Sequence, residues 1–437
     1  MSGDRSVSPD RHELTPETVW HIDMPEIRFG RDAADELAFQ LRDLGVPDGA
    51  GGLLVTDEGL VSAGHADRVA GHLDEAGFAV DVYEDCEREP SIGAVEDCID
   101  LVTAETEDGY DFYVGLGGGS VLDTAKTTRA VVANGGEPLD YVAAPTGEGE
   151  PLTEAGPPLV LLPTTAGTGS EISPVAILSV PDEQIKEGIS SNHVRADAAV
   201  LDPTLTTTLP PEQTAKTAMD ALGHAIEGYT THEYDSLLRA SDPGDRPVYG
   251  GRTPLTEMFS EKAIELLSTN VRKAVHNGDD LEARENMLLG ALFGAISGLT
   301  AGASLCHAMA YPVGNRYHTY HGETIAVLTP ASTIEYNAAS DPERFADLAE
   351  LFGVDTTGLS NAAAAAALKD EYVQLQRDLG VLPSGLTELA GITAEDLDWL
   401  AAQTVDTQER LLRCNPRPVT EAAVRDVFEA ALHNWQE

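Results

Sequence analysis

Short apolar runs alternate with amphipathic stretches in the first half of the chain. Five of these runs have the length and composition of strands: 25–30, 52–56, 79–83, 112–115 and 159–162. Helical patterns separate them, and strands joined by helical crossovers form a parallel sheet with helices on both faces. We therefore predict an α/β domain over residues 21–205, preceded by a polar extension over residues 1–20.

Helical periodicity dominates from Pro211 to the end of the chain. It includes six consecutive alanines at 362–367, and alanine is the strongest helix former. The segment 234–253 contains DPGD and YGG and is predicted to be an extended loop between helices. We place the domain boundary near 202–210 and predict an all-α domain over residues 206–437.

One apolar segment, 287–315, contains no Asp, Glu, Lys or Arg. Its glycines recur at every fourth position and place a smooth stripe along one helix face: Gly290, Gly294, Gly298 and Gly302. In a membrane such a stripe would form a dimer seam, whereas in a bundle it lets a neighbouring helix approach closely. The segment carries Ser, Thr and His, and no second span exists. We predict a buried helix with His307 near its end, and no membrane partner.

Charge narrows the classes of function. With 27 Lys and Arg against 74 Asp and Glu, the formal net charge is −47, which excludes a nucleic-acid binder or a binder of anionic membranes. The composition is similar to that of halophilic proteins from salt-accumulating archaea, and an acidic protein of a low-salt organism is the alternative. Four widely spaced cysteines and a polar N-terminal stretch favour a cytoplasmic location.

A glycine-rich turn follows one predicted strand, in the segment FYVGLGGGSVLDTAK at 112–126. Gly117, Gly118 and Gly119 permit close backbone approach, so that amides at the start of the next helix can face a pyrophosphate, with the Ser120 hydroxyl as a further donor. A tight turn without a ligand is the alternative. We interpret residues 21–205 as a dinucleotide-binding domain.

Two further segments favour a nicotinamide dinucleotide. Asp57 follows a strand, where a carboxylate accepts hydrogen bonds from a ribose diol and repels a 2′-phosphate, which favours NAD over NADP. A surface aspartate is the alternative, and the acid precedes the glycine turn rather than following it. The segment PTTAGTGSEIS at 163–173 offers the hydroxyls of Thr164, Thr165 and Ser170 to a ligand.

The helical half contains candidate metal ligands. Asp220 and His224 are four residues apart in one predicted helix and therefore project from one face, although helix salt bridges use the same spacing. His307 and His321 lie downstream, and the four side chains together suit Fe²⁺ or Zn²⁺ with positions left for a substrate.

In combination these motifs resemble those of iron-containing (group III) alcohol dehydrogenases. The resemblance runs from about Pro25 to Ala431 through GLGGGSVLDTAK, PTTAGTGSE, LDPTLTTTLPP, MDALGHAIEGY and CNPRPVTEAAV. It implies a dehydroquinate synthase-like fold with the active site in a cleft between the two domains, and a homodimer or larger assembly. It also places residues on the family's metal-ligand and cofactor positions: Asp220, His224, His307 and His321 for metal, and Asp57, Gly117 to Ser120, Asp123, Thr164, Thr165 and Lys186 for cofactor.

One departure from the family pattern concerns the substrate. Tyr311 occupies a position that is a histidine in many members. Two interpretations of Tyr311 are open: it carries a proton in catalysis, or it is a tyrosine of the protein core. The tyrosine and the insertion YDSLLRASDPGDRPVYGG are similar to those of the hydroxyacid-oxoacid transhydrogenases, whereas the short spacing from His307 to His321 resembles ordinary alcohol dehydrogenases. His318 has no counterpart among the ligands. We expect an NAD-dependent enzyme acting on an alcohol or aldehyde, with the transhydrogenase as the alternative.

Overall fold

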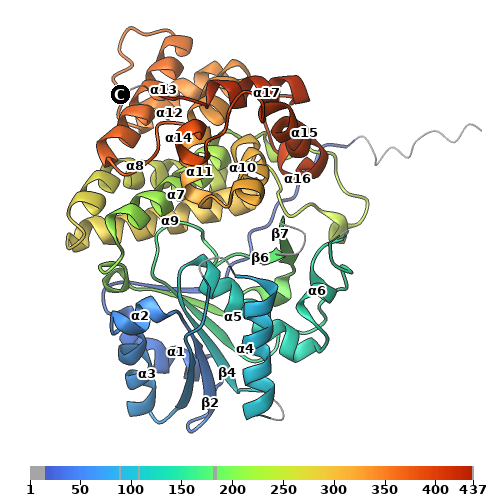
Figure 1. Ribbon diagram of the computed structural model, residues 1–437, viewed down its shortest axis with the longest axis vertical. Helices are drawn as coiled ribbons and strands as arrows, with labels where there is room; N and C mark the ends of the chain where they lie inside the picture. Colours follow the sequence, from blue (N-terminus) through green and yellow to red (C-terminus); the bar gives the residue numbers. More distant parts are fainter. Residues whose placement is uncertain (1–14, 88–89, 107–108, 145, 181–184, 436–437) are drawn as a thin grey trace, which may run out of the picture.

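The computed structural model describes residues 15–87, 90–106, 109–144, 146–180 and 185–435. The first fourteen residues of the predicted polar extension lie outside them. Figure 1 shows two layers along the long axis of the molecule, with the sheet in one and most of the longer helices in the other. Both the α/β class of the first half and the helical class of the second half are confirmed.

A six-stranded parallel sheet forms the first half, in the order β1-β8-β5-β4-β2-β3. Its strands are β1 (Glu26–Phe29), β2 (Gly51–Val55), β3 (Ala79–Tyr83), β4 (Phe112–Gly117), β5 (Leu159–Pro163) and β8 (Ala198–Leu201). All five predicted strands are present. The sequence pattern missed β8, which is four residues long and half alanine, because so short a run has no periodicity of its own.

Helices cover the sheet and bury both of its faces. They are α1 (Leu37–Asp43), α2 (Glu58–Ser62), α3 (His65–Glu75), α4 (Ile92–Glu105), α5 (Gly119–Asn134) and α6 (Pro138–Tyr141). Separate apolar clusters lie on the two faces, one around Leu54 and Val114 and the other around Leu53 and Tyr113. Because neighbouring residues of a strand point to opposite faces, these strands are apolar throughout.

An antiparallel hairpin of β6 (Val175–Val180) and β7 (Ile185–Ser190) stands apart from the main sheet. Figure 1 places it between the sheet layer and the helical layer. The sequence prediction missed it, although burial alternates along β6 as expected for a strand with one covered face. The hairpin supplies one wall of the cleft described below.

The second half is helical. It contains α7 (Pro211–Thr230), α8 (Pro254–His276), α9 (Leu281–Ala301), α10 (Leu305–Tyr317), α11 (His321–Leu328), α12 (Pro342–Leu351), α13 (Asn361–Leu379), α14 (Leu386–Ala390), α15 (Leu397–Thr407), α16 (Glu409–Leu412) and α17 (Glu421–Ala430). A π-helical turn (Pro330–Tyr336) follows α11. The alanine run lies in α13, and the predicted loop 234–253 connects α7 to α8 with only two short 3-10 turns.

The glycine stripe of α9 packs against α7, as the sequence predicted for a buried helix. A β-carbon on Gly294 would lie 2.9 Å from the carbonyl oxygen of Ala221, and one on Gly298 would lie 2.8 Å from that of His224. The prediction that His307 ends this helix was wrong. Gly302 has φ 125°, which favours glycine, and the chain breaks there and turns into α10.

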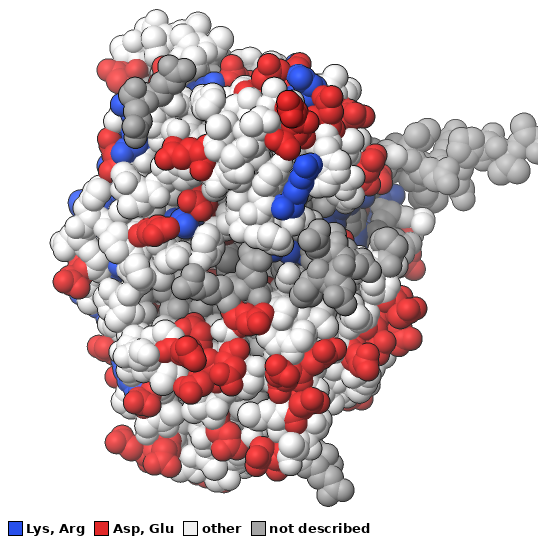
Figure 2. Space-filling model, in the orientation of Figure 1, with Lys and Arg blue, Asp and Glu red and all other residues white. Residues whose placement is uncertain are grey.

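Among the described residues, no single helix meets both the length and the apolar composition of a membrane span. Only α9 and α10 taken together do so, and they are bent by 98°. Acidic side chains cover much of the sheet-containing half of the face in Figure 2, where basic side chains are sparse.

Candidate active site

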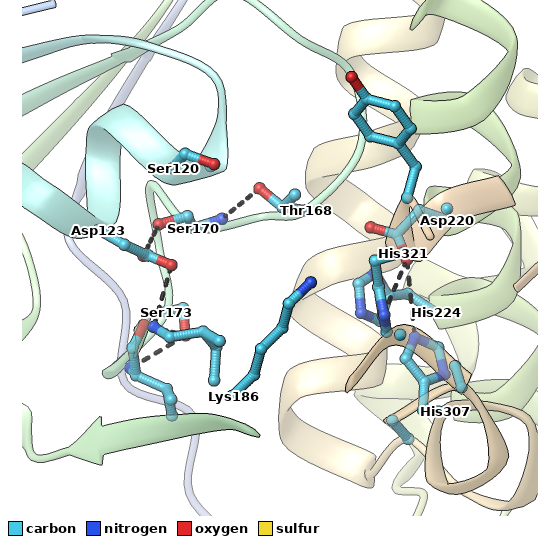
Figure 3. Close-up of a pocket in the computed structure, with 18 of the residues that line it drawn as sticks. Ser120, Asp123, Thr168, Ser170, Ser173, Lys186, Asp220, His224, His307 and His321 are labelled. Carbon is cyan, nitrogen blue, oxygen red and sulfur yellow. Dashed lines mark hydrogen bonds and ion pairs between the residues drawn. The ribbon is translucent and has the colours of Figure 1, made fainter. Parts of the chain in front are cut away.

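A cleft of about 360 Å³ separates the turn between β4 and α5 from the helices α7, α10 and α11. Residues of the β6–β7 hairpin and of the loop that follows β5 complete its lining. Figure 3 shows two groups of polar side chains facing across it, Ser120 and Asp123 on one side and the histidines on the other, with Lys186 between them. All four predicted metal ligands and most of the predicted cofactor residues therefore line one cavity.

Three of the four predicted metal ligands form a tight buried cluster. One donor atom each from Asp220, His224 and His307 lies within 4.8 Å of the others. The imidazoles of His224 and His307 are stacked with ring centroids 4.6 Å apart. His321, at the start of α11, completes the group, because its Nε2 lies 3.6 Å from Oδ1 of Asp220.

The spacing of these atoms fits a cation. Oδ1 of Asp220 lies 3.8 Å from Nε2 of His307, too far for a hydrogen bond. Two ligands about 2.1 Å from a tetrahedral metal are about 3.4 Å apart, close to the observed separations. Both atoms are buried without a hydrogen-bond partner within the described chain, as is Nδ1 of His224. Buried polar atoms of native proteins are rarely unsatisfied, so the donor set fits a divalent metal.

Charge at two of the predicted ligands, Asp220 and His224, favours ligation. Burial opposes ionisation of Asp220, but the surrounding histidines outweigh it and hold the pKa of this carboxyl below its usual range. Burial lowers the pKa of His224 to about 4, so this imidazole is neutral at pH 7. A carboxylate and a neutral imidazole are the forms that bind a metal.

Glu227 is a functional residue that the sequence analysis missed. It lies on the same face of α7 as Asp220 and His224, and its carboxylate is fully buried. Its oxygens accept hydrogen bonds from the backbone amides of Ser304 (2.7 Å) and Cys306 (2.8 Å), and Oε2 lies 2.5 Å from Nδ1 of His307. This contact holds Nδ1 of His307 and leaves Nε2 toward Asp220, as in carboxylate–histidine–metal triads.

Replacing Glu227 by glutamine should weaken metal binding about 10- to 100-fold, the usual effect of losing such a partner. The glutamine amide cannot accept all the hydrogen bonds that the carboxylate receives, so the His307 ring loses its fixed orientation. Calorimetric titration of the apo-protein with Fe²⁺ or Zn²⁺ measures the change, and circular dichroism verifies the fold. Unchanged metal affinity in a folded variant would remove Glu227 from this role.

The other predicted ligand, His321, is positioned by a close helix contact. Gly322 packs directly against the backbone carbonyl of Lys216 in α7, and a β-carbon there would overlap that oxygen. The side chain of His321 is 41% exposed, more than those of the other three ligands. His318 instead ends α10 in the left-handed conformation with φ 53° and is exposed, outside the cluster.

On the opposite wall, β4 ends at Gly117 and α5 begins at Gly119, with Gly118 as its N-cap. Gly118, Gly119 and Ser120 line the cleft. A β-carbon on Gly119 would lie 2.9 Å from the Thr168 side chain, so this turn has no room for a larger residue. The first amides of a sixteen-residue helix thus lie beside the cavity, and a helix N-terminus favours an anionic group.

Asp123 also borders the cleft but is held by its own neighbours. Its Oδ1 accepts hydrogen bonds from Oγ of Ser170 (2.5 Å) and Nζ of Lys126 (3.1 Å), and its Oδ2 accepts one from the amide of Ile177 (3.1 Å). Asp123 therefore ties α5, the loop after β5 and the β6–β7 hairpin together. This network fixes the cofactor wall.

Only some of the remaining predicted cofactor residues line the cleft. Thr165 and Lys186 line the cleft. Thr164 is buried behind it, and its amide donates to the carbonyl of Gly117, which couples two loops. Asp57 is not part of the cleft lining. It caps α2, where its carboxylate accepts a hydrogen bond from the amide of Leu60 at 3.1 Å.

Tyr311 lies in the cleft next to the metal ligands, with its ring centroid 6.1 Å from that of His321. Burial raises the pKa of Tyr311 to about 12, although the charge of Arg410 opposes the shift. The phenol is therefore protonated at neutral pH and can donate a hydrogen bond. The sequence analysis had left open whether Tyr311 is a catalytic proton carrier or a core tyrosine.

Comparisons with known proteins agree with this geometry. The sequence model of "Iron-containing alcohol dehydrogenase" matches residues 25–203, and that of "Fe-containing alcohol dehydrogenase family, C-terminal" matches residues 249–432. Long-chain-alcohol dehydrogenase 1 of Geobacillus thermodenitrificans is 35% identical, with 93% of this chain and 95% of the relative covered. Mitochondrial hydroxyacid-oxoacid transhydrogenase of Mus musculus is 31% identical, with 98% and 93% covered.

Solved structures give the same result. A 1,3-propanediol oxidoreductase has a TM-score of 0.83 at 31% identity, covering 95% of this chain and 100% of the other. Sulfoacetaldehyde reductase from Bifidobacterium kashiwanohense, in complex with NAD⁺, has a TM-score of 0.80 at 25% identity, with 95% and 99% covered. The chain belongs to the iron-containing alcohol dehydrogenase family.

Proposed function

We propose that this protein is an NAD-dependent, iron-dependent oxidoreductase that interconverts an alcohol and an aldehyde or ketone. The observation that carries the proposal is the buried cluster of Asp220, His224 and His307 with unsatisfied donor atoms, in the same cleft as the N-terminus of α5. Membership of the iron-containing alcohol dehydrogenase family supports iron as the metal. Zn²⁺ suits the same ligands and is the alternative.

One wall of the cleft would bind the metal, and the opposite wall would bind the cofactor. A divalent ion bound by Asp220, His224, His307 and His321 would supply a Lewis acid for the substrate oxygen. The amides of Gly119 and Ser120 would bind the pyrophosphate and fix the nicotinamide near that oxygen. Glu227 holds the imidazole ring of His307 in position, so His307 would contribute to catalysis as a metal ligand. Tyr311 would donate a hydrogen bond within the substrate pocket.

The cofactor is proposed to be NAD rather than NADP because Asp57 follows β2 on the nucleotide side of the fold. Replacing Asp57 by glycine should improve kcat/KM for NADP about tenfold, the effect of removing roughly 1.4 kcal/mol of repulsion toward a 2′-phosphate. Glycine is a suitable replacement because it costs an N-cap only a few tenths of a kcal/mol. Steady-state assays with both cofactors measure the ratio of kcat/KM for NADP to that for NAD. An unchanged ratio would show that Asp57 does not set the cofactor preference through the ribose.

The direct test of the function uses purified apo-protein reloaded with Fe²⁺ or Zn²⁺ under anaerobic conditions. A panel of primary and secondary alcohols is assayed for reduction of free NAD⁺ at 340 nm, in low and in molar KCl. We expect metal-dependent NADH formation. Absence of turnover with every alcohol and every metal, in a protein that binds both metal and NAD, would overturn the proposal.

A second candidate is a hydroxyacid-oxoacid transhydrogenase that retains its nicotinamide between two half-reactions. Two features favour it: the transhydrogenase relative aligns with 98% of this chain, and the insertion 234–251 supplies Tyr249 to the cleft. The two functions separate in one assay. An alcohol dehydrogenase reduces free NAD⁺, whereas the transhydrogenase turns over only when an oxoacid acceptor is added.

We also propose a homodimer or larger assembly in a salt-rich cytoplasm. The assembly rests on the family resemblance alone, whereas the net charge of −47 and four free cysteines support the salt-rich cytoplasm. A dense acidic surface remains soluble at high salt, where screening relieves its self-repulsion.

A further inference from the structure

Three side chains line one part of the cleft, here called the tyrosine–arginine end: Tyr249 from the insertion 234–251, Tyr311 from α10 and Arg410 from α16. The guanidinium carbon of Arg410 lies 5.2 Å from the centroid of the Tyr249 ring. Tyr311 packs against the apolar cluster that contains Tyr249, and its ring centroid lies 6.1 Å from that of the predicted ligand His321. This tyrosine–arginine end is therefore next to the metal ligands, in the cavity that receives the substrate.

Arg410 has no polar partner in the described part of the chain, neither an ion pair nor a side-chain hydrogen bond. This is unusual here, because most of the described arginines are paired with a carboxylate or a carbonyl. The charge of Arg410 acts on one nearby carboxylate, that of Glu187 in β7, but the two do not form an ion pair. An arginine that lacks a carboxylate partner, in a chain with 74 acidic residues, is available to a ligand.

The two phenols are likewise free to donate. Within the described residues neither hydroxyl has a hydrogen-bond partner. A phenol is protonated at neutral pH, so both hydroxyls are hydrogen-bond donors. The tyrosine–arginine end thus contains two hydroxyl donors and the guanidinium donors of Arg410. Within the described residues, none of these side-chain donors has an acceptor. A carboxylate is the complementary group, since arginine binds it in a bidentate manner.

The insertion is built into this end of the cleft. The amides of Gly250 and Gly251 donate to the carbonyls of Thr300 (2.9 Å) and Ala301 (3.0 Å) at the last turn of α9. Tyr249 is only 7% exposed and packs where the chain breaks at Gly302. The backbone therefore fixes Tyr249 below Arg410 rather than leaving it on a surface loop.

We propose that Arg410, Tyr249 and Tyr311 form a subsite for the carboxylate of the substrate, so that the preferred alcohol substrates are hydroxy acids. This rests on the proposed oxidoreductase function and names its substrate class. The reaction is hydroxy acid plus NAD⁺ giving oxo acid, NADH and a proton. The carbinol carbon loses a hydride to the nicotinamide, the hydroxyl loses its proton to solvent, and the carboxylate takes no part in the bond changes.

The test compares alcohols that differ only in the carboxylate: 3-hydroxypropionate, 4-hydroxybutyrate and 5-hydroxypentanoate against propan-1-ol, butan-1-ol and pentan-1-ol. Each is assayed at constant ionic strength with metal-loaded enzyme and NAD⁺, with an oxoacid acceptor added in a parallel series. The key variant is Arg410→Met, which keeps the aliphatic bulk and removes the charge. The matched control is Arg413→Met, because Arg413 is exposed like Arg410 and lies only three residues further along the chain, but is outside the cleft lining.

We expect the best hydroxy acid to exceed its neutral partner in kcat/KM by about 10- to 100-fold, the effect of one charged, bidentate contact. Arg410→Met should abolish that advantage and raise the inhibition constant of the matching unreactive carboxylate, such as butyrate, by a similar factor. It should alter oxidation of the neutral alcohol less than threefold, and Arg413→Met should behave like wild type.

Equal activity on both series in the wild type, or an equal loss on both in Arg410→Met, would overturn the subsite and leave the oxidoreductase proposal intact. Inhibition by butyrate that is unchanged in a folded Arg410→Met protein would overturn it as well. Failure of the proposed function gives a different result, namely no turnover with either series.

Discussion

Replacing His307 by alanine is expected to remove the bound metal and lower turnover by at least about 10³-fold, while NAD binding stays measurable. The loss corresponds to roughly 4 kcal/mol of transition-state stabilisation, within the range that a metal Lewis acid supplies. NAD binding survives because the turn at Gly118 and the start of α5 lie on the opposite wall of the cleft. Metal analysis after gel filtration, steady-state kinetics and calorimetric titration with NAD measure the three quantities.

A matched control is His318→Asn. His318 is only eleven residues further along the chain but is exposed at the end of α10, and asparagine tolerates its left-handed backbone. This variant should retain metal and activity. Full activity in a metal-free His307→Ala protein, or equal metal loss in both variants, would refute the assignment of His307.

Replacing Gly298 by alanine should destabilise the protein by about 1–3 kcal/mol and weaken metal binding. A β-carbon at this position would lie 2.8 Å from the carbonyl oxygen of His224 and 3.0 Å from its α-carbon. Backbone cannot move aside as a side chain does, so α9 would be pushed away from the part of α7 that carries a ligand. Urea denaturation gives the stability, and titration of the apo-protein gives the metal affinity.

The control for this substitution is Gly71→Ala in α3, where a β-carbon would meet nothing within 4 Å. Alanine there should stabilise the protein by about 0.5–1 kcal/mol, because it restricts the unfolded chain and favours the helix. If Gly298→Ala were as stable as Gly71→Ala and bound metal normally, close packing of α9 on α7 would not support the site.

One part of the metal cluster could be predicted from a local pattern. The spacing of Asp220 and His224 is a helix-face pattern, and it is local. The glycine stripe of α9 is also local, and it predicted the close approach that the structure shows at Gly294 and Gly298. Signals of this kind depend on residues a few positions apart, which short-range geometry determines.

The parts that escaped prediction depend on contacts distant in sequence. Glu227 binds His307 across 80 residues, and Arg410 meets Tyr249 from a separate helix. Glu227 did carry a usable signal, since it is an acid seven residues after Asp220 and therefore lies on the same face of the helix. The sequence carried no signal for the end of α9 at Gly302, because Gly302 continues the four-residue spacing of the glycine stripe and therefore looks like part of the same helix.

The central claim is that Asp220, His224, His307 and His321 bind one metal ion beside the nicotinamide site. Crystals of the Fe²⁺-loaded enzyme, grown anaerobically, test it through an anomalous difference map at the iron absorption edge. The account predicts one strong peak, about 2.0–2.3 Å from a donor atom of each of the four side chains. A peak elsewhere in the molecule, or none in protein shown to contain one iron per chain, would contradict it.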